Sequence, residues 1–187
     1  MLDLARTERP ATGNGISVSE RPARTCINLR GVGSDARFAR AVAAVTDLQL
    51  PLDPGGSATG LLASVLWLGP DEWLVVSETQ PASELAARLR QALSGIHSAV
   101  TDVGEGCIVY AVSGHNSRDV LAKGCSVDLH PRAFTPGRCA RSLLAKMPVL
   151  LHLRDADPTF ELYVARSYRE YAWAWLVSAA GEYLQPG

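Results

Sequence analysis

The clearest pattern of hydrophobic and polar positions lies at residues 64–77. Two apolar runs rich in Val, Leu and Trp, at 64–68 and 73–77, are separated by the segment Gly-Pro-Asp-Glu. Such runs suit a pleated surface, while Pro70 and Asp71 favour a tight turn between them. The segment is therefore predicted to form a β-hairpin whose two indole rings bury much apolar area.

Two amphipathic helices are predicted on either side of this hairpin. The first follows a short strand at 26–30, with Ser34 as its N-cap and an end near Thr46. The second begins at Ser83 and ends at Gly95. Their apolar residues recur every three or four positions, as on one face of a helix: Phe38, Val42 and Val45 in the first, and Leu85, Leu89 and Leu93 in the second.

The same order of elements recurs in the second half of the chain. These elements are a strand at 107–112, a short helix at 116–123, strands at 138–145, 149–154 and 159–165, and a helix from the capping box Ser167-x-x-Glu170 to about Ala180, ended by Gly181. The first half adds a closing strand at 98–103, and residues 126–137 are expected to form a loop. The repeat predicts an α+β fold of two pseudo-repeated strand-helix-hairpin-helix units, about 24–103 and 104–184, with a mainly antiparallel sheet and helices packed on one face.

Residues 1–23 lie outside this repeat. They are mostly polar, contain two prolines and two glycines, and show no sustained period. They are therefore predicted to be a flexible N-terminal arm that precedes a 24–184 domain.

Composition and charge narrow the class of protein. The chain has 187 residues, 47% of them hydrophobic and 20% charged, which fits one ordinary globular domain or two small units. A net charge of −1 argues against a nucleic-acid partner, and no apolar run reaches the about 18 residues of a membrane span. No secretory signal is visible, and the four scattered cysteines are expected to be free thiols, so the predicted location is cytoplasmic.

A glycine-rich turn offers one candidate for nucleotide binding. The segment Gly31–Ala36 matches G-x-G-x-x-A, and Asp53 lies 20 residues after Gly33, where a ribose-binding acid would lie. Pro51 interrupts the strand that would carry this acid, and hairpins follow instead of parallel crossovers, so nucleotide binding is only an alternative. The four histidines share no ligand spacing and no nucleophile elbow is present, so no catalytic, cofactor-binding or metal-ligating residue is predicted.

Partner contacts are predicted in one loop and on the last helix. The loop Asp128–Phe134 carries an imidazole, a guanidinium and an aromatic ring, at His130, Arg132 and Phe134. Arg132 could clamp a carboxylate of a ligand, of a partner chain or of this chain itself. On the last helix, Trp173 is expected to turn away from the face that carries the other rings, and Trp is favoured at the centres of interfaces. These four residues are our candidates for contact with a partner.

Several stretches resemble the gamma subunit of heterotetrameric sarcosine oxidase. The hairpin Trp67–Val76 resembles the signature hairpin of that family, and the run Leu121–Ala140, which contains Asp-Leu-His-Pro-Arg-Ala-Phe, is the most specific match. The likeness continues through Pro158–Leu162 and Arg166–Tyr168 and covers roughly residues 24–184.

This family is in turn similar to the folate-binding fold of the aminomethyltransferases. There, a Gly-Gly-x-x-Asp-Asp segment on a hairpin strand supplies the carboxylate that works at the folate. The matching stretch here is Met147–His152, and its counterpart in the first unit is Ala63–Trp67; neither contains a carboxylate. Because such a group would hold and deprotonate an amine, the resemblance implies the scaffold without the chemistry.

The resemblance implies a non-catalytic structural and assembly subunit of a sarcosine oxidase complex, with the alpha, beta and delta subunits as partners. Such a complex demethylates sarcosine oxidatively to glycine, gives hydrogen peroxide, and passes the one-carbon unit to tetrahydrofolate as 5,10-methylene-tetrahydrofolate. FAD, FMN and NAD are expected in the alpha and beta chains and zinc in the delta chain, with no cofactor in this chain. The alternative is a stand-alone folate-binding or aminomethyltransferase-like one-carbon enzyme.

Overall fold

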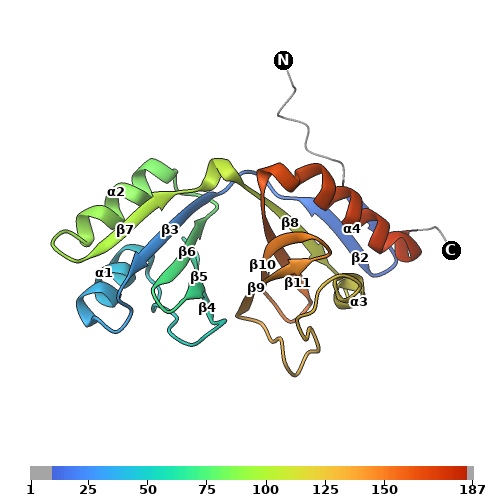
Figure 1. Cartoon of the computed structure of the whole chain (residues 1–187), viewed down its shortest axis with the longest axis horizontal. Helices are drawn as coiled ribbons and strands as arrows, with labels where there is room; N and C mark the ends of the chain where they lie inside the picture. The colour runs from blue at the N-terminus through green and yellow to red at the C-terminus, as the bar shows by residue number, and fades with distance from the viewer. Residues whose placement is uncertain (1–9, 185–187) are drawn as a thin grey trace, which may run out of the picture.

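The computed structural model describes residues 10–184, which fold into two antiparallel sheets with helices on their outer sides (Figure 1). The first sheet has the strand order β4-β5-β6-β3-β7. Its elements are β3 (Thr25–Gly31), α1 (Ala36–Thr46), β4 (Ser57–Thr59), β5 (Ser64–Gly69), β6 (Glu72–Ser77), α2 (Ala82–Ala92) and β7 (Ser98–Asp102).

The second sheet has the order β1-β2-β8-β11-β10-β9. Its elements are β1 (Ala11–Gly13), β2 (Ile16–Glu20), β8 (Cys107–Ser113), α3 (Ser117–Ala122), β9 (Arg138–Leu144), β10 (Met147–Leu153), β11 (Thr159–Ala165) and α4 (Arg169–Leu184), with single 3-10 turns at η1 (Gly104–Gly106) and η2 (Arg166–Tyr168). The predicted α+β class with antiparallel sheets is confirmed. None of the helices in residues 10–184 is long and apolar enough to cross a membrane.

The predicted hairpin is present as β5 and β6. Trp67 lies opposite Trp73 in the register of the two strands. Trp73 is fully buried, and its indole Nε1 donates to the carbonyl of Pro51 at 2.8 Å, so the polar end of the ring is satisfied inside the core. The hairpin thus anchors the first sheet to the loop that precedes it.

The apolar stripes of both predicted helices are buried, but the helix ends differ from prediction. The N-cap of α1 is Asp35, one residue after Ser34, because its carboxylate accepts the backbone N–H of Arg37 at 2.8 Å. The N-cap of α2 is Pro81, and Ser83 lies inside the helix.

The last helix also departs from the predicted ends. Its first turn is the 3-10 helix η2 in place of the predicted capping box. At the other end, α4 continues through Gly181 to Leu184, since Tyr183 and Leu184 still pack against the core of the second sheet.

The N-terminal segment is part of the fold, so the predicted flexible arm is wrong for residues 11–20. Strand β2 pairs with β8, and its alternate residues Ile16 and Val18 are buried against the second sheet. The alternation of Ile-Ser-Val-Ser-Glu is the period of a half-buried strand, but five residues are a weak signal before a loop. Residues 1–9 of the predicted arm lie outside the described residues.

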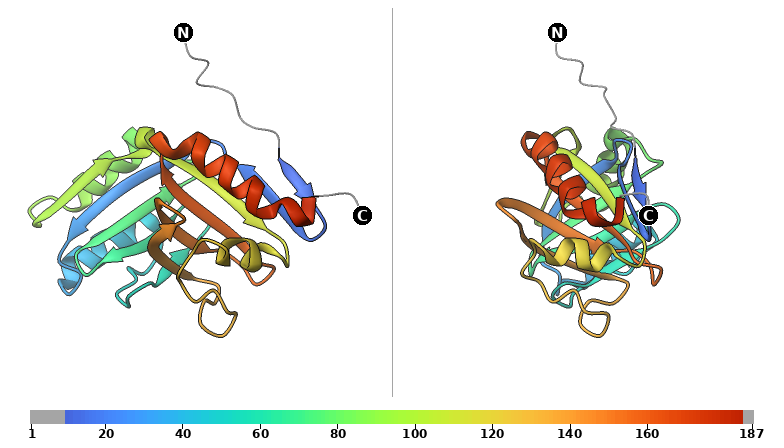
Figure 2. Two further views of the ribbon diagram at one scale, coloured as in Figure 1. Left: turned by 45° about the vertical axis from the view of Figure 1, so that its right-hand side comes forward. Right: turned by 90° about the vertical axis from the view of Figure 1, so that its right-hand side faces the viewer.

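These N-terminal strands correct the predicted unit boundaries. Strand β7 forms the edge of the first sheet by pairing with β3, whereas in the second sheet β2 pairs with β8 and β1 forms the edge. In sequence, however, β2 leads directly into β3 and β7 leads into β8. The first sheet is thus built from one continuous stretch, whereas the second takes β1 and β2 from the segment that precedes β3; the connections β2–β3 and β7–β8 join the two sheets at their common end (Figure 2).

Three apolar clusters hold the layers together. Helices α1 and α2 pack on the outer face of the first sheet, and α3 and α4 pack on the outer face of the second. The third cluster contains strand residues from both sheets and lies between their inner faces: Cys26, Leu66, Leu74, Val76, Val109, Cys139, Leu150 and Tyr163. We call this third cluster the inter-sheet layer.

Candidate functional site

The inter-sheet layer ends in a group of charged side chains, of which Arg24 and Glu161 are buried. Arg24, at the start of the first sheet, binds the carboxylate of Glu161 on β11 at 2.7 Å and that of Glu78 at 3.0 Å. Arg154, which follows β10, binds both carboxylates as well, at 3.0 Å and 2.8 Å. Tyr163 donates its hydroxyl to Glu161 at 2.9 Å. Two guanidinium groups and two carboxylates, contributed by both sheets, thus form one network, here called the Glu161 cluster.

Burial and charge act in opposite directions on the Glu161 carboxyl. Its side chain is 2% exposed, and burial alone would raise its pKa. The imidazole of His152 and the guanidinium groups of Arg24 and Arg154 favour the charged form and hold the pKa well below its usual range. The His152 Nδ1 to Glu161 Oε2 distance of 3.8 Å is longer than a hydrogen bond, so the two guanidinium groups carry the effect.

His152 lies beside the Glu161 cluster with both of its ring nitrogens unsatisfied in the described part of the chain. It is 1% exposed on β10, directly opposite Glu161 in the register, and neither ring nitrogen has a hydrogen-bond partner within residues 10–184. Sequence reasoning missed this cluster because Arg24, Glu78 and Glu161 lie far apart in the chain. The available signal was the charged residue inside the otherwise apolar strand Thr159–Ala165.

A second ionic group lies at the other side of the layer and is much more exposed. Glu72 on β6 binds Arg141 of β9 at 3.2 Å, Arg30 of β3 at 3.3 Å and the amide of Asn28 at 2.7 Å. Burial would raise the pKa of Glu72, but the Asn28 hydrogen bond and the two guanidinium groups lower it. We call this group the Glu72 cluster.

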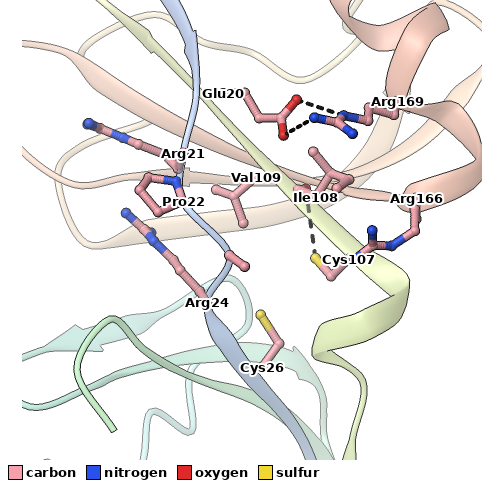
Figure 3. Close-up of a pocket in the computed structure, with 11 residues that line it drawn as sticks. Glu20, Arg21, Pro22, Arg24, Cys26, Cys107, Ile108, Val109, Arg166 and Arg169 are labelled. Carbon is pink, nitrogen blue, oxygen red and sulfur yellow. Dashed lines mark hydrogen bonds and ion pairs between the residues drawn. The ribbon is translucent and has the colours of Figure 1, made fainter. Parts of the chain in front are cut away.

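A small cavity opens between the sheets next to the Glu161 cluster (Figure 3). The thiols of Cys26 on β3 and Cys107 on β8 face each other across it, and both are free. The hydrogen bond from the Cys26 thiol lowers the pKa of Cys107. No group of three or more His, Cys, Asp or Glu within residues 10–184 is placed to hold a metal ion.

The structure separates the four predicted contact residues into two classes. His130 and Arg132 are exposed in the loop before β9. Phe134 is 4% exposed and stacks on Phe160 with centroids 6.1 Å apart, so most of its ring lies in the core. Trp173 is half-buried, with its ring centroid 6.2 Å from that of Tyr110. The exposed ring of α4 is instead Tyr171, at 41%.

The structure also shows where the glycine-rich turn and the two aminomethyltransferase-like stretches lie. Gly31–Ala36 joins β3 to α1, but β3 pairs antiparallel with both neighbours, so the parallel crossover of a dinucleotide-binding unit is missing. Met147–His152 lies in β10 and Ala63–Trp67 contains most of β5, the equivalent hairpin strands of the two sheets. The nearest buried carboxylate, Glu161, lies on the next strand and is bound by two arginines.

Comparison with known proteins shows which family has this fold. The model of the sarcosine oxidase, gamma subunit family matches residues 30–182. A sarcosine oxidase subunit gamma from Arthrobacter is 35% identical over 179 residues, which are 94% of this chain and 85% of the relative. A chain of the heterotetrameric sarcosine oxidase from Corynebacterium sp. U-96 superposes with a TM-score of 0.85 at 32% identity, over 95% of this chain and 89% of that chain.

A more distant likeness concerns the fold alone. The aminomethyltransferase of the glycine cleavage system from Bartonella henselae superposes with a TM-score of 0.65 at 14% identity, over 89% of this chain and 46% of that chain. The expected relation to the aminomethyltransferase fold is therefore confirmed. Sequence, length and fold agree, and this chain belongs to the sarcosine oxidase gamma-subunit family.

Proposed function

We propose that this chain is a structural and assembly subunit of a heterotetrameric sarcosine oxidase, in contact with alpha, beta and delta subunits. The observation that carries the proposal is the match of nearly the whole chain to a chain of such a heterotetramer. Its contribution is a rigid surface of fixed shape, and a permanent interface of this kind buries upward of about 2,000 Å².

The state of the buried ionisable groups supports a structural role. Glu161 and Arg24 bind each other and further partners, so neither is left to bind an amine or a folate. We place FAD, FMN, NAD and zinc in the other subunits, and sarcosine demethylation with transfer of the one-carbon unit to tetrahydrofolate at their sites. We place the complex in the cytoplasm.

Omission of this chain tests the proposal. The alpha, beta and delta subunits are produced together with and without it, and the yield of heterotetramer, flavin content and sarcosine oxidation are measured. We expect that the three remaining subunits fail to form a stable complex and that the separately purified chain restores assembly and activity together. A three-subunit complex that assembles normally but has lost one-carbon transfer would contradict the proposal.

The isolated chain provides the second arm of the test. Calorimetric titration with tetrahydrofolate is expected to give no binding heat, and the chain alone is expected to leave sarcosine unchanged. Tight folate binding or demethylation by the isolated chain would instead establish the stand-alone one-carbon enzyme.

A further inference from the structure

A surface groove lies where the two sheets meet on the side of β5 and β9. It has a volume of about 440 Å³, an apolar floor that includes Trp67, Leu68 and Phe134, and a polar rim that includes Arg138 and Asp128. Strand β5 of the hairpin, with Gly55, forms one wall, and the loop 126–137 that precedes β9 forms the other (Figure 1). These are the same two stretches, far apart in sequence, that most resemble the gamma-subunit family.

The groove is built into the free chain by hydrogen bonds between its walls. The backbone N–H of Cys139 donates to the carbonyl of Gly55 at 2.8 Å, and its thiol donates to the carbonyl of Gly56 at 3.2 Å. The N–H of Ser57 donates to the carbonyl of Gly137 at 2.9 Å. A ligand that enters a preformed groove loses less free energy to ordering the protein than one that must open it.

One arginine, Arg118, holds the loop 126–137 in place. Arg118 on α3 donates to the carbonyl of Leu129 and, at 3.1 Å, to the carbonyl of Phe134. The same guanidinium lies over the ring of Phe160, 5.3 Å from its centroid. The loop therefore presents Arg132 to solvent from a fixed base.

The groove carries more positive than negative charge. In the lining, Arg141 is neutralised by Glu72, whereas Arg138 has no ion pair within residues 10–184. Arg132 also has none in that range; it lies outside the lining, in the exposed loop directly before the lining residue Ala133. Asp128 lies in the same loop, where its carboxylate accepts the N–H of His130 at 2.9 Å. The guanidinium of Arg138 at the rim, with that of Arg132 in the adjoining loop, is complementary to a carboxylate that accompanies an apolar side chain.

We propose that this groove is the docking site for a polypeptide segment of another subunit of the complex, which inserts an apolar side chain between Trp67 and Phe134 and directs a carboxylate at Arg138 and Arg132. The inference rests on the proposed function and adds to it the surface and the chemistry of one partner contact. A polypeptide fits because the groove is open and continuous with the exposed loop, and because buried aromatic floors with arginine rims are the usual centres of protein interfaces.

Charge reversal at the rim tests the groove within the complex. The four subunits are produced together with Arg132→Glu/Arg138→Glu in this chain, and the yield of complex is measured by co-purification at low and high salt. We expect at least a tenfold lower yield with the double variant, and a wild-type yield that falls as salt is raised. The matched control is Arg40→Glu/Lys146→Glu, which makes the same charge change at two exposed residues outside the groove and is expected to assemble normally.

A second variant blocks the groove without changing its charge. Ala133 is exposed at the lip, so Ala133→Trp is expected to fill the space and to reduce assembly while the thermal unfolding of the isolated chain stays unchanged. Normal assembly of both groove variants would overturn the inference and leave the proposed function intact. If the wild-type chain fails to assemble at all, the proposed function itself fails.

The isolated chain separates a docking site from a small-molecule site. Titration with glutarate, a small dicarboxylate, is expected to show no saturable binding. Saturable binding of glutarate that Arg138→Glu abolishes, with assembly unaffected, would overturn the docking proposal.

Discussion

The Glu161 and Glu72 clusters flank the same inter-sheet layer, yet they differ in burial. In the first, the side chains of Glu161 and Arg24 are 2% and 6% exposed. In the second, Glu72 is 13% exposed, but its partners Arg30 and Arg141 are 55% and 53% exposed. In each cluster one carboxylate binds two guanidinium groups, and the Glu161 cluster contains Glu78 as a second, exposed carboxylate, so the main contrast is the burial of the central ion pairs.

The difference indicates which cluster fixes the arrangement of the sheets. A buried charge without its partner has a large desolvation cost, so Glu161 and Arg24 are stable together only when the two sheets are in place. Exposed pairs are screened by water and contribute little. The Glu161 cluster is therefore expected to set the relative position of the two sheets, and the Glu72 cluster to add only a small increment.

The largest expected effect is that of Glu161→Gln. This change keeps the size of the side chain and leaves the buried guanidinium of Arg24 without its closest carboxylate, so the free energy of unfolding should fall by about 3–5 kcal/mol. Chemical denaturation of the isolated chain measures it, with Glu72→Gln as the matched control. Equal losses for the two variants would mean that burial does not distinguish the clusters.

Glu161 should also determine how the free energy of unfolding depends on pH in the acidic range. Because the pKa of Glu161 is lowered in the folded chain, the unfolded chain takes up this proton first as pH falls below about 4.3, and stability is lost in that range. Denaturation midpoints measured between neutral and acidic pH should therefore fall less steeply in Glu161→Gln than in the wild type. Parallel curves for the two proteins would show that Glu161 titrates normally.

A smaller effect is expected for Glu72→Gln. The loss should be about 1 kcal/mol or less, since the arginines stay hydrated and the Asn28 hydrogen bond is only partly buried. High salt should shrink the difference between wild type and variant further. A loss as large as that of Glu161→Gln, persisting in high salt, would contradict this ranking.

The smallest expected effect concerns the reactivity of the cysteines, which report on how accessible the inter-sheet layer is. Burial raises the pKa of Cys139 to about 11, whereas the hydrogen bond from Cys26 lowers the pKa of the half-buried Cys107. Iodoacetamide near pH 8 should therefore alkylate Cys107 at least tenfold faster than Cys139, as followed by peptide mass spectrometry. Comparable rates would mean that the layer opens as a whole.

Local patterns in the sequence predicted the helices and strands, but they did not predict contacts between residues that are far apart in the chain. The hairpin at 64–77 and the stripe Leu85, Leu89 and Leu93 follow from propensity and period, which neighbouring residues determine. Strand β2 was missed because its partner β8 lies about 90 residues away in the chain. The burial of Phe134 could not be predicted, because its position in a loop says nothing of the ring of Phe160 on which it stacks.

Native mass spectrometry of the complex isolated through a tag on this chain tests the proposed role in assembly. We predict one copy of this 20.0 kDa chain together with three different polypeptides and bound flavin. A tagged chain that is recovered alone, or only as copies of itself, and that binds tetrahydrofolate would contradict it.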